Sequence, residues 1–205
     1  MLRYQEVPLA VLLISASLPI QLLVAILVFL QLGSPLMFRQ RRAGLNGREI
    51  AIAKFRTMND LRDSHGELLP DDQRQTKMTR LIRRLRLDEL PQLWPVLTGQ
   101  MALVGPRPLL PQTLADFGEL GVLRNSVRPG LTGWAQVNGN TRLSNSEKLA
   151  MDLWYVTHRS FWLDMRVLAE TFLVPLRGEI RDDGRLRLAT DWARAEFGSA
   201  IEVAA

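Results

Sequence analysis

The feature that most constrains this sequence is a stretch without a charged residue, which runs from Val7 to Phe38 and covers 32 positions. Leu, Val, Ile and Ala dominate it, so it is too apolar for an ordinary soluble helix. As a straight helix it would extend about 48 Å, which exceeds the roughly 30 Å hydrocarbon core of a bilayer. We therefore expect the chain to enter a membrane, and the excess length favours a break in the helix.

A polar cluster centred on Ser17 and Pro19 is the expected break. Proline removes a backbone hydrogen bond and kinks a helix, and nearby polar side chains can satisfy the freed carbonyls. Arg3 precedes the apolar run and Arg39 follows it, so positive charge flanks both ends. A re-entrant helix-break-helix hairpin over residues 1–35 fits these flanks. A kinked single-pass anchor stays open as the alternative.

The composition points to anionic partners. Lys and Arg number 26 against 21 Asp and Glu, and 23 of the 26 are arginine, whose planar fork suits phosphate oxygens. The chain has no cysteine and only two well separated histidines, which argues against a disulfide framework and a zinc site. The membrane run and the lack of a base-stacking motif argue against nucleic acid as the partner. Anionic lipid and phosphorylated small molecules remain.

Local patterns predict an α+β fold that is mostly helical. At 205 residues the chain allows one soluble domain beside the membrane element. Residues 36–58 predict a small β-hairpin that turns at Gly44 to Gly47. We expect a basic amphipathic, interfacial helix over 74–86, a helix over 111–124, and a helical segment over 146–177 split near His158. The predicted organisation is a membrane hairpin (1–35), a compact cytoplasmic catalytic domain (36–177) and a tail (178–205).

Two adjacent carboxylates, Asp88 and Glu89, stand just before Pro91. A carboxylate is ionised at neutral pH, with a reference pKa of about 4, so Asp88 could attack a phosphoryl group without a base to activate it. The commoner explanation is helix capping, because proline fits the first helical position and acidic groups favour the positive end of the helix dipole. These residues alone leave both interpretations open.

Arg107 lies between Pro106 and Pro108, which restrict the backbone on both sides. Its guanidinium would be pre-positioned for an anion at low entropic cost, unless the segment is only a rigid turn with its arginine in solvent. A loop rich in glycine and polar amides follows at residues 127–139, where backbone donors could approach a ligand closely.

Five stretches in consistent order resemble the bacterial sugar transferases, the small monotopic polyprenyl-phosphate phosphoglycosyl transferases. The resemblance extends from about Leu12 to Asp164, and it depends on the five together, since none is specific alone. The stretches are Phe38-Arg39-Gln40 with Gly44-Leu45, Lys54-Phe55-Arg56-Thr57-Met58, Leu87-Asp88-Glu89-Leu90-Pro91-Gln92-Leu93-Trp94, Val104-Gly105-Pro106-Arg107-Pro108-Leu109, and Val127-Arg128-Pro129-Gly130 through Gln136-Val137-Asn138-Gly139.

The resemblance implies a monotopic protein of the bacterial inner membrane, with its active site on the cytoplasmic face, that performs the first membrane step of glycan assembly. Asp88 would attack the β-phosphate of a UDP-sugar and release UMP. Polyprenyl (undecaprenyl) phosphate would then take the sugar phosphate from Asp88. Glu89 would hold Mg²⁺ together with Asp88 or accept a proton from the lipid phosphate, and the sequence leaves both roles open. Membrane phospholipid is a further expected partner, and a homodimer stays open.

The resemblance also assigns roles to seven further residues. Arg107 and Arg128 would contact phosphate oxygens, Lys54 and Arg56 would form a positive wall, Gln136 and Asn138 would contact sugar or nucleotide, and Asp152 would take a supporting or metal-side role.

Four positions depart from the family's usual pattern. Leu18 precedes Pro19 where serine is usual, Ala43 replaces proline, Arg86 replaces Ser or Thr, and Asn140-Thr141 replaces Arg-Asn. The last change means that a sugar preference does not carry over from the family to this chain.

The competing hypothesis for the whole chain is a non-catalytic, membrane-anchored scaffold that binds anionic lipid through its arginine helix.

Overall fold

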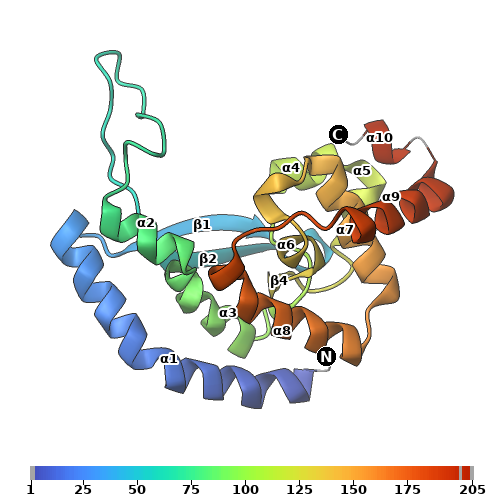
Figure 1. Cartoon of the computed structure of the whole chain (residues 1–205), viewed down its shortest axis with the longest axis horizontal. Coiled ribbons are helices and arrows are strands. Elements are labelled where there is room, and N and C mark those ends of the chain that lie inside the picture. The colour runs from blue at the N-terminus through green and yellow to red at the C-terminus, as the bar shows by residue number, and fades with distance from the viewer. Residues whose placement is uncertain (1–2, 199, 204–205) are drawn as a thin grey trace.

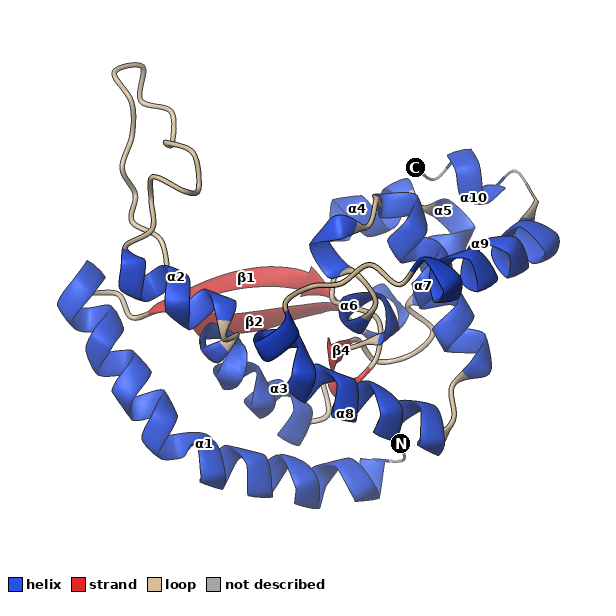
Figure 2. Ribbon diagram, viewed as in Figure 1, coloured by secondary structure: helices blue, strands red, loops and turns tan. Residues whose placement is uncertain are grey.

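A long N-terminal helix, α1 (Arg3–Leu32), runs along the outside of a body of short helices and two small sheets (Figure 1). The computed structural model describes residues 3–198 and 200–203. Helix dominates and the strands are few (Figure 2), so the predicted mostly helical α+β class is confirmed.

Helix α1 bends but does not break. It is continuous across Pro8 and Pro19, and Figure 1 shows it curving around one side of the body. Ser17 Oγ donates to the Ile14 carbonyl at 3.1 Å, and Gln21 Nε2 donates to Ser17 Oγ at 2.9 Å. The expected break at Ser17 and Pro19 is therefore a bend within one continuous helix.

The predicted β-hairpin is confirmed. Strands β1 (Met37–Ala43) and β2 (Glu49–Phe55) pair antiparallel, with Met37 opposite Phe55 and Ala43 opposite Glu49. Asn46 and Gly47 adopt positive φ values of 52° and 74° in the connecting turn, which fits their residue types. A long loop then projects from the body before the next helix (Figure 1).

The basic helix is shorter than predicted. Thr76 is the N-cap of helix α2 (Lys77–Arg84), and its side chain forms a capping box with Thr79. A 3₁₀ helix, η2 (Leu87–Gln92), follows and leads into α3 (Leu93–Leu97). Pro91 lies inside η2 and does not start an α-helix, and the two carboxylates lie in the first turn of η2 without a side-chain capping hydrogen bond.

Two short parallel strands, β3 (Ala102–Val104) and β4 (Gly130–Thr132), form the second sheet. The helix predicted over 111–124 is divided into α4 (Pro111–Asp116) and α5 (Gly118–Arg124), because Gly118 adopts a positive φ of 54° between them. The remaining short elements are η1 (Leu45–Gly47), α6 (Trp134–Val137) and η3 (Asn140–Arg142).

The helical segment predicted over 146–177 is confirmed with its split, as α7 (Asn145–His158) and α8 (Phe161–Arg177). The segment predicted to be a tail ending in a weak Ala-rich helix contains α9 (Asp183–Phe197) and α10 (Ala200–Val203). Its sequence lacks a strong apolar stripe, so its helical packing was not evident. The main core includes side chains from α1, α3, β3, α7, α8 and α9, and Leu186 and Ala189 bring α9 into it.

Candidate active site

The two carboxylates lie on η2, directly after a strained residue. Arg86 precedes η2 with a left-handed backbone (φ 56°), which is unusual for a residue with a side chain. Asp88 is buried, with 3% of its surface exposed, and the Glu89 side chain is 14% exposed. Strand β2 packs against η2 and brings Lys54 to the same place.

Burial raises the pKa of Asp88 to about 6, and the neighbouring charge of Glu89 adds to this effect. Lys54 and Arg83 act in the opposite direction and favour the carboxylate. Burial in turn lowers the pKa of Lys54, partly offset by Asp88. Asp88 therefore remains mostly ionised at neutral pH, but with little solvent around it, which is a suitable state for a nucleophile.

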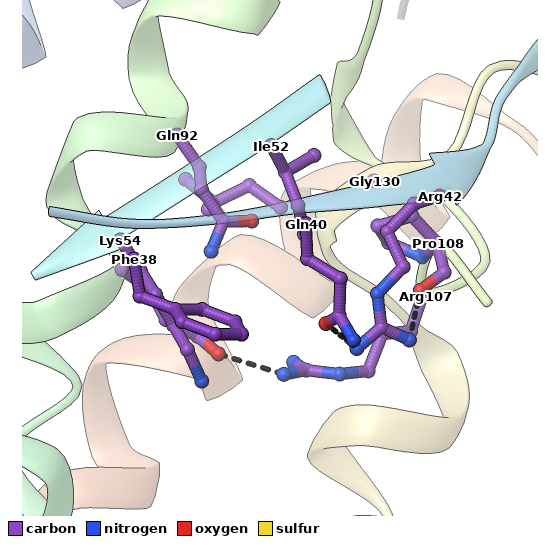
Figure 3. A pocket seen from close by; sticks show the side chains of 11 residues that line it. Phe38, Gln40, Arg42, Ile52, Lys54, Gln92, Arg107, Pro108 and Gly130 are labelled. Atoms are coloured by element: carbon purple, nitrogen blue, oxygen red, sulfur yellow. Dashed lines mark hydrogen bonds and ion pairs between the residues drawn. The ribbon is translucent and has the colours of Figure 1, made fainter. Parts of the chain in front are cut away.

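Glu89 is held by two arginines. Arg107 Nη2 donates to Glu89 Oε1 at 2.7 Å, and Arg86 Nη1 lies 3.6 Å from Glu89 Oε2. Burial alone would raise the pKa of Glu89, but Arg107 and then Arg86 and Lys54 outweigh it, so that pKa lies below its usual range. In Figure 3 the Arg107 side chain extends from its loop towards Phe38 and Lys54 on the hairpin.

Close backbone packing positions Arg107. A Cβ on Gly130 would lie 2.1 Å from Gly105 N, and one on Gly105 would lie 2.6 Å from Arg128 O, so neither site admits a side chain. Arg124 Nη2 also donates to the Arg107 carbonyl at 2.7 Å. The Arg107 segment is closely packed, and its guanidinium pairs with Glu89 while 44% of the side chain stays exposed to solvent.

The carboxylates open into a cationic hollow of about 300 Å³. Its five basic residues outnumber its three acidic ones, so the hollow attracts a multiply charged anion such as a pyrophosphate. The charged lining residues are Lys54, Arg83, Arg84, Arg86, Arg107, Asp88, Glu89 and Glu179.

An apolar cavity of about 280 Å³ adjoins this hollow, and Arg86 and Glu89 line both. Most of its wall consists of aliphatic and aromatic side chains from α1, η2 and α8, among them Leu13, Leu90 and Phe172. The arrangement places a hydrocarbon-lined space beside an anion site.

Arg56 and Arg128 lie outside the hollow. Arg56 donates to the carbonyls of Leu32 and Gly33, so it caps the C-terminal end of α1. Arg128 Nη2 pairs with Glu6 Oε2 at 2.6 Å, which neutralises it. The structure therefore gives both arginines structural partners and does not bring them to Asp88.

The amides expected to contact sugar or nucleotide are also engaged by the protein. Asn138 Nδ2 donates to the Trp134 carbonyl at 2.8 Å, and Asn138 Oδ1 accepts from Arg185 at 2.7 Å. Gln136 Nε2 donates to the Leu131 carbonyl, while its Oε1 is buried without a hydrogen-bond partner in the described part of the chain. Of the two, only Gln136 lines a cavity.

Asp152 does not line the cationic hollow but acts on it through Arg124. Its Oδ2 accepts from Arg124 at 2.6 and 2.9 Å, and Arg124 in turn holds the Arg107 carbonyl. Both side chains are almost fully buried. This geometry fits the supporting role and not the metal-side role, because Arg124 already neutralises the carboxylate.

Comparison with known proteins identifies the family. Residues 1–178 match the bacterial sugar transferase family. The chain belongs to this family. A Bacillus subtilis (strain 168) relative, named as an uncharacterized sugar transferase EpsL, is 47% identical over 169 residues, which are 82% of this chain and 84% of the relative.

Two longer relatives carry more specific names. The undecaprenyl-phosphate glucose phosphotransferase of Komagataeibacter xylinus is 42% identical over 174 residues, 78% of this chain and 32% of the relative. The UDP-N-acetylgalactosamine-undecaprenyl-phosphate N-acetylgalactosaminephosphotransferase of Aeromonas hydrophila is 36% identical over 188 residues, 86% of this chain and 44% of the relative. This sugar transferase thus spans less than half the length of these two relatives.

Several residues of this sugar transferase's hollow lie outside the motifs that predicted the site. Arg83, Arg84 and Arg86 belong to the segment predicted as a basic interfacial helix, although their position just before Asp88 was a usable signal. Glu179 lies in the presumed tail, where no local pattern marked it.

Proposed function

We propose that this sugar transferase transfers a sugar 1-phosphate from a UDP-sugar to undecaprenyl phosphate and releases UMP. The observation that carries the proposal is a buried, ionised Asp88 in a cationic hollow that adjoins an apolar cavity. The names of the relatives from Komagataeibacter xylinus and Aeromonas hydrophila support it, since both describe phosphotransferases acting with undecaprenyl phosphate.

In the first step an Asp88 carboxylate oxygen attacks the β-phosphorus of the donor. The bond from that phosphorus to the bridging oxygen breaks, and UMP leaves with the bonding electrons. The product is an acyl phosphate that joins the sugar phosphate to Asp88. Arg107 and Lys54 stand beside the carboxylates and would neutralise phosphate oxygens, which carries much of the catalysis in phosphoryl transfer.

In the second step an oxygen of the lipid phosphate attacks the same phosphorus, and the Asp88 carboxylate is the leaving group. One phosphoanhydride in the donor is exchanged for another in the product, so the scheme needs no external energy source. Glu89 stands next to the reacting group, either to bind the metal or to accept a proton. Its low pKa, caused chiefly by Arg107, disfavours proton transfer, and a metal would share the Glu89 carboxylate with Arg107 and Arg86.

Magnesium fits the oxygen donors of this site. Mg²⁺ commonly binds through one or two carboxylates together with substrate phosphates and water, and Asp88 and Glu89 provide two adjacent carboxylates. Burial and the repulsion of Glu89 raise the pKa of Asp88, and a bound cation would favour its ionised form. When bound, Mg²⁺ would neutralise charge on the phosphate oxygens.

A monotopic membrane topology is supported by where the two ends of α1 pack. Near its beginning, Glu6 is buried against Arg128 and accepts from the Leu103 amide. Near its end, Val24 and Val28 pack with Phe55 and Ile82. Both ends thus contact one soluble body, whereas a spanning helix would carry one end away from it.

The apolar surface agrees with this topology. Helix α1 is long and apolar enough to cross a membrane by length and composition. Helix α8 exposes Trp162 (79%), Phe172 (70%) and Leu176 (80%), and α1 exposes a series of leucines such as Leu22 and Leu30. Exposure of this extent is stable where lipid covers the surface. The active site would face the cytoplasm, where UDP-sugars are found.

The test of function is UMP release by the purified, detergent-solubilised protein. We expect release that requires both a UDP-sugar and undecaprenyl phosphate, and with donor alone a radiolabelled sugar phosphate that stays on the protein until hydroxylamine removes it. Asp88→Asn should abolish both signals. Retained turnover in this variant would reject Asp88 as the nucleophile, and binding to anionic vesicles without any UMP would support the scaffold hypothesis instead.

Topology has its own test, because the chain has no cysteine. Single cysteines introduced near Arg3 and in α9 should both react with a membrane-impermeant maleimide from the cytoplasmic side of inside-out vesicles. Reaction of the Arg3 site only from the opposite side would establish a spanning helix.

A further inference from the structure

Glu179, which follows α8, binds two separate parts of the hollow at once. Its Oε1 accepts from Arg86 Nη2 at 2.9 Å and from Asn140 Nδ2. Its Oε2 accepts from the Thr141 amide at 3.2 Å and from the Thr141 hydroxyl. One carboxylate therefore joins the residue before η2 to the loop that contains Asn140 and Thr141.

Two of the three partners, Arg86 and Asn140, have left-handed backbones. Among the described residues, those other than glycine with positive φ are Asn46, Arg86 and Asn140, and two of these three donate to Glu179. The conformation is unfavourable for an arginine and persists where surrounding contacts hold it, whereas asparagine adopts it more readily. The contacts of Glu179 supply that restraint on both sides of the hollow.

The carboxylate has little remaining capacity for a ligand. A carboxylate offers about four acceptor positions, and the protein already occupies that number on Glu179. Burial would raise the pKa of Glu179, but the hydrogen bonds from Thr141 and Asn140 and the charge of Arg86 hold it below its usual range. Glu179 is therefore a permanent anion that holds other groups, and not a ligand of metal or sugar.

The groups that Glu179 holds line the cationic hollow in which the donor is proposed to bind. Arg86 is shared between Glu179 and Glu89, so the charges alternate from Arg107 through Glu89 and Arg86 to Glu179. Asn140 and Thr141, with Arg107, line both the cationic hollow and a second cavity of about 260 Å³. The position of this loop decides how the two spaces connect.

We propose that Glu179 is a positioning residue that determines which donor sugars the enzyme accepts, by fixing Arg86 and the Asn140-Thr141 loop. This inference deepens the proposed function and depends on it. Two of the positions that depart from the family's usual pattern, Arg86 and Asn140-Thr141, meet at this one carboxylate. The loop and the residue before η2 would thus act on the donor as one unit.

The test compares Glu179→Gln with the unaltered enzyme in UMP release, with UDP-glucose and UDP-N-acetylgalactosamine as donors. Glutamine has the size of glutamate but no negative charge to pair with Arg86. Its NH₂ group is a donor, so it cannot accept hydrogen bonds from both Asn140 and Thr141 as the carboxylate does. We expect the ratio of kcat/KM between the two donors to change roughly tenfold or more, mainly through KM, because charge-assisted hydrogen bonds of this kind are lost. Arg86→Gln should shift the ratio in the same direction, and the double variant should add little.

Glu49→Gln is the matched control, since Glu49 forms an exposed ion pair with Arg41 on the hairpin. It should leave the ratio unchanged. An unchanged donor ratio in both Glu179→Gln and Arg86→Gln would overturn the inference, even if the amount of folded protein falls. Failure of the unaltered enzyme to release UMP from any donor would reject the proposed function instead, so the two failures are distinguishable.

Discussion

Asp88→Asn is expected to stabilise the protein while it abolishes turnover. The folded protein holds the Asp88 carboxylate in a buried position beside Glu89, which raises its pKa from 3.8 to about 6. Each pKa unit corresponds to about 1.36 kcal/mol, so the ionised side chain destabilises the fold by about 3 kcal/mol at neutral pH. Asparagine has nearly the same shape and no charge, so it relieves this penalty.

The sign of the pH dependence follows from the raised pKa. Below pH 3.8 the carboxyl is protonated in the folded and unfolded chains alike, and the penalty is absent. Between pH 3.8 and about 6 the unfolded chain loses its proton first, so the penalty grows as pH rises; above about 6 it is constant. The advantage of Asp88→Asn should therefore be full at pH 7.5 and small at pH 4.

Thermal unfolding in detergent micelles measures this difference. For a chain of this size, about 3 kcal/mol corresponds to a rise in Tm of roughly 6–12 °C at pH 7.5. Asp191→Asn is the control, because Asp191 is exposed on α9. A Tm for Asp88→Asn equal to or below that of the unaltered protein at pH 7.5, or a gain that persists undiminished at pH 4, would refute the reasoning.

Four further outcomes are expected. UMP release at saturating donor should fall about tenfold per pH unit below pH 6 as Asp88 takes up a proton, which a pH-rate profile measures. Arg107→Gln should lower turnover and, because it removes a cation that interacts with both Asp88 and Glu89, move the acidic limb of the same profile to higher pH. Asp152→Asn should lower the free energy of unfolding by about 3–5 kcal/mol, since it leaves the buried Arg124 without its counter-charge; a change under 1 kcal/mol in urea unfolding would contradict this. EDTA should abolish UMP release and excess Mg²⁺ restore it, whereas unchanged activity would exclude the proposed metal.

Much of the fold could be predicted from local patterns. The apolar run became α1, the alternation around Gly44 to Gly47 became the hairpin, and the split near His158 separates α7 from α8. These features depend on residues within one or two turns of each other, which a sequence displays directly. The division at Gly118 and the 3₁₀ helix at Asp88 were missed because backbone geometry, not periodicity, decides them.

The candidate site divides in the same way. Asp88, Glu89, Lys54 and Arg107 meet as the motifs predicted, because a short turn, a strand and a proline-flanked loop each fix one of them. The roles of the other arginines depended on which partner lay closest in space. Arg56 caps α1 and Arg128 pairs with Glu6, 122 positions away, whereas Arg86 reaches Glu89 and Glu179.

The sequence by itself determined that the chain begins with a long apolar helix, that it is mostly helical, and that an aspartate follows a cluster of arginines. Tertiary structure alone decided which charges pair, that α1 bends along the body, and that Glu179, from the segment predicted as a tail, lines the hollow and pairs with Arg86. The reason is that hydrophobic periodicity is a local property of the chain. The energy of a charge depends on burial and on partners within a few ångströms, which only the folded chain brings together.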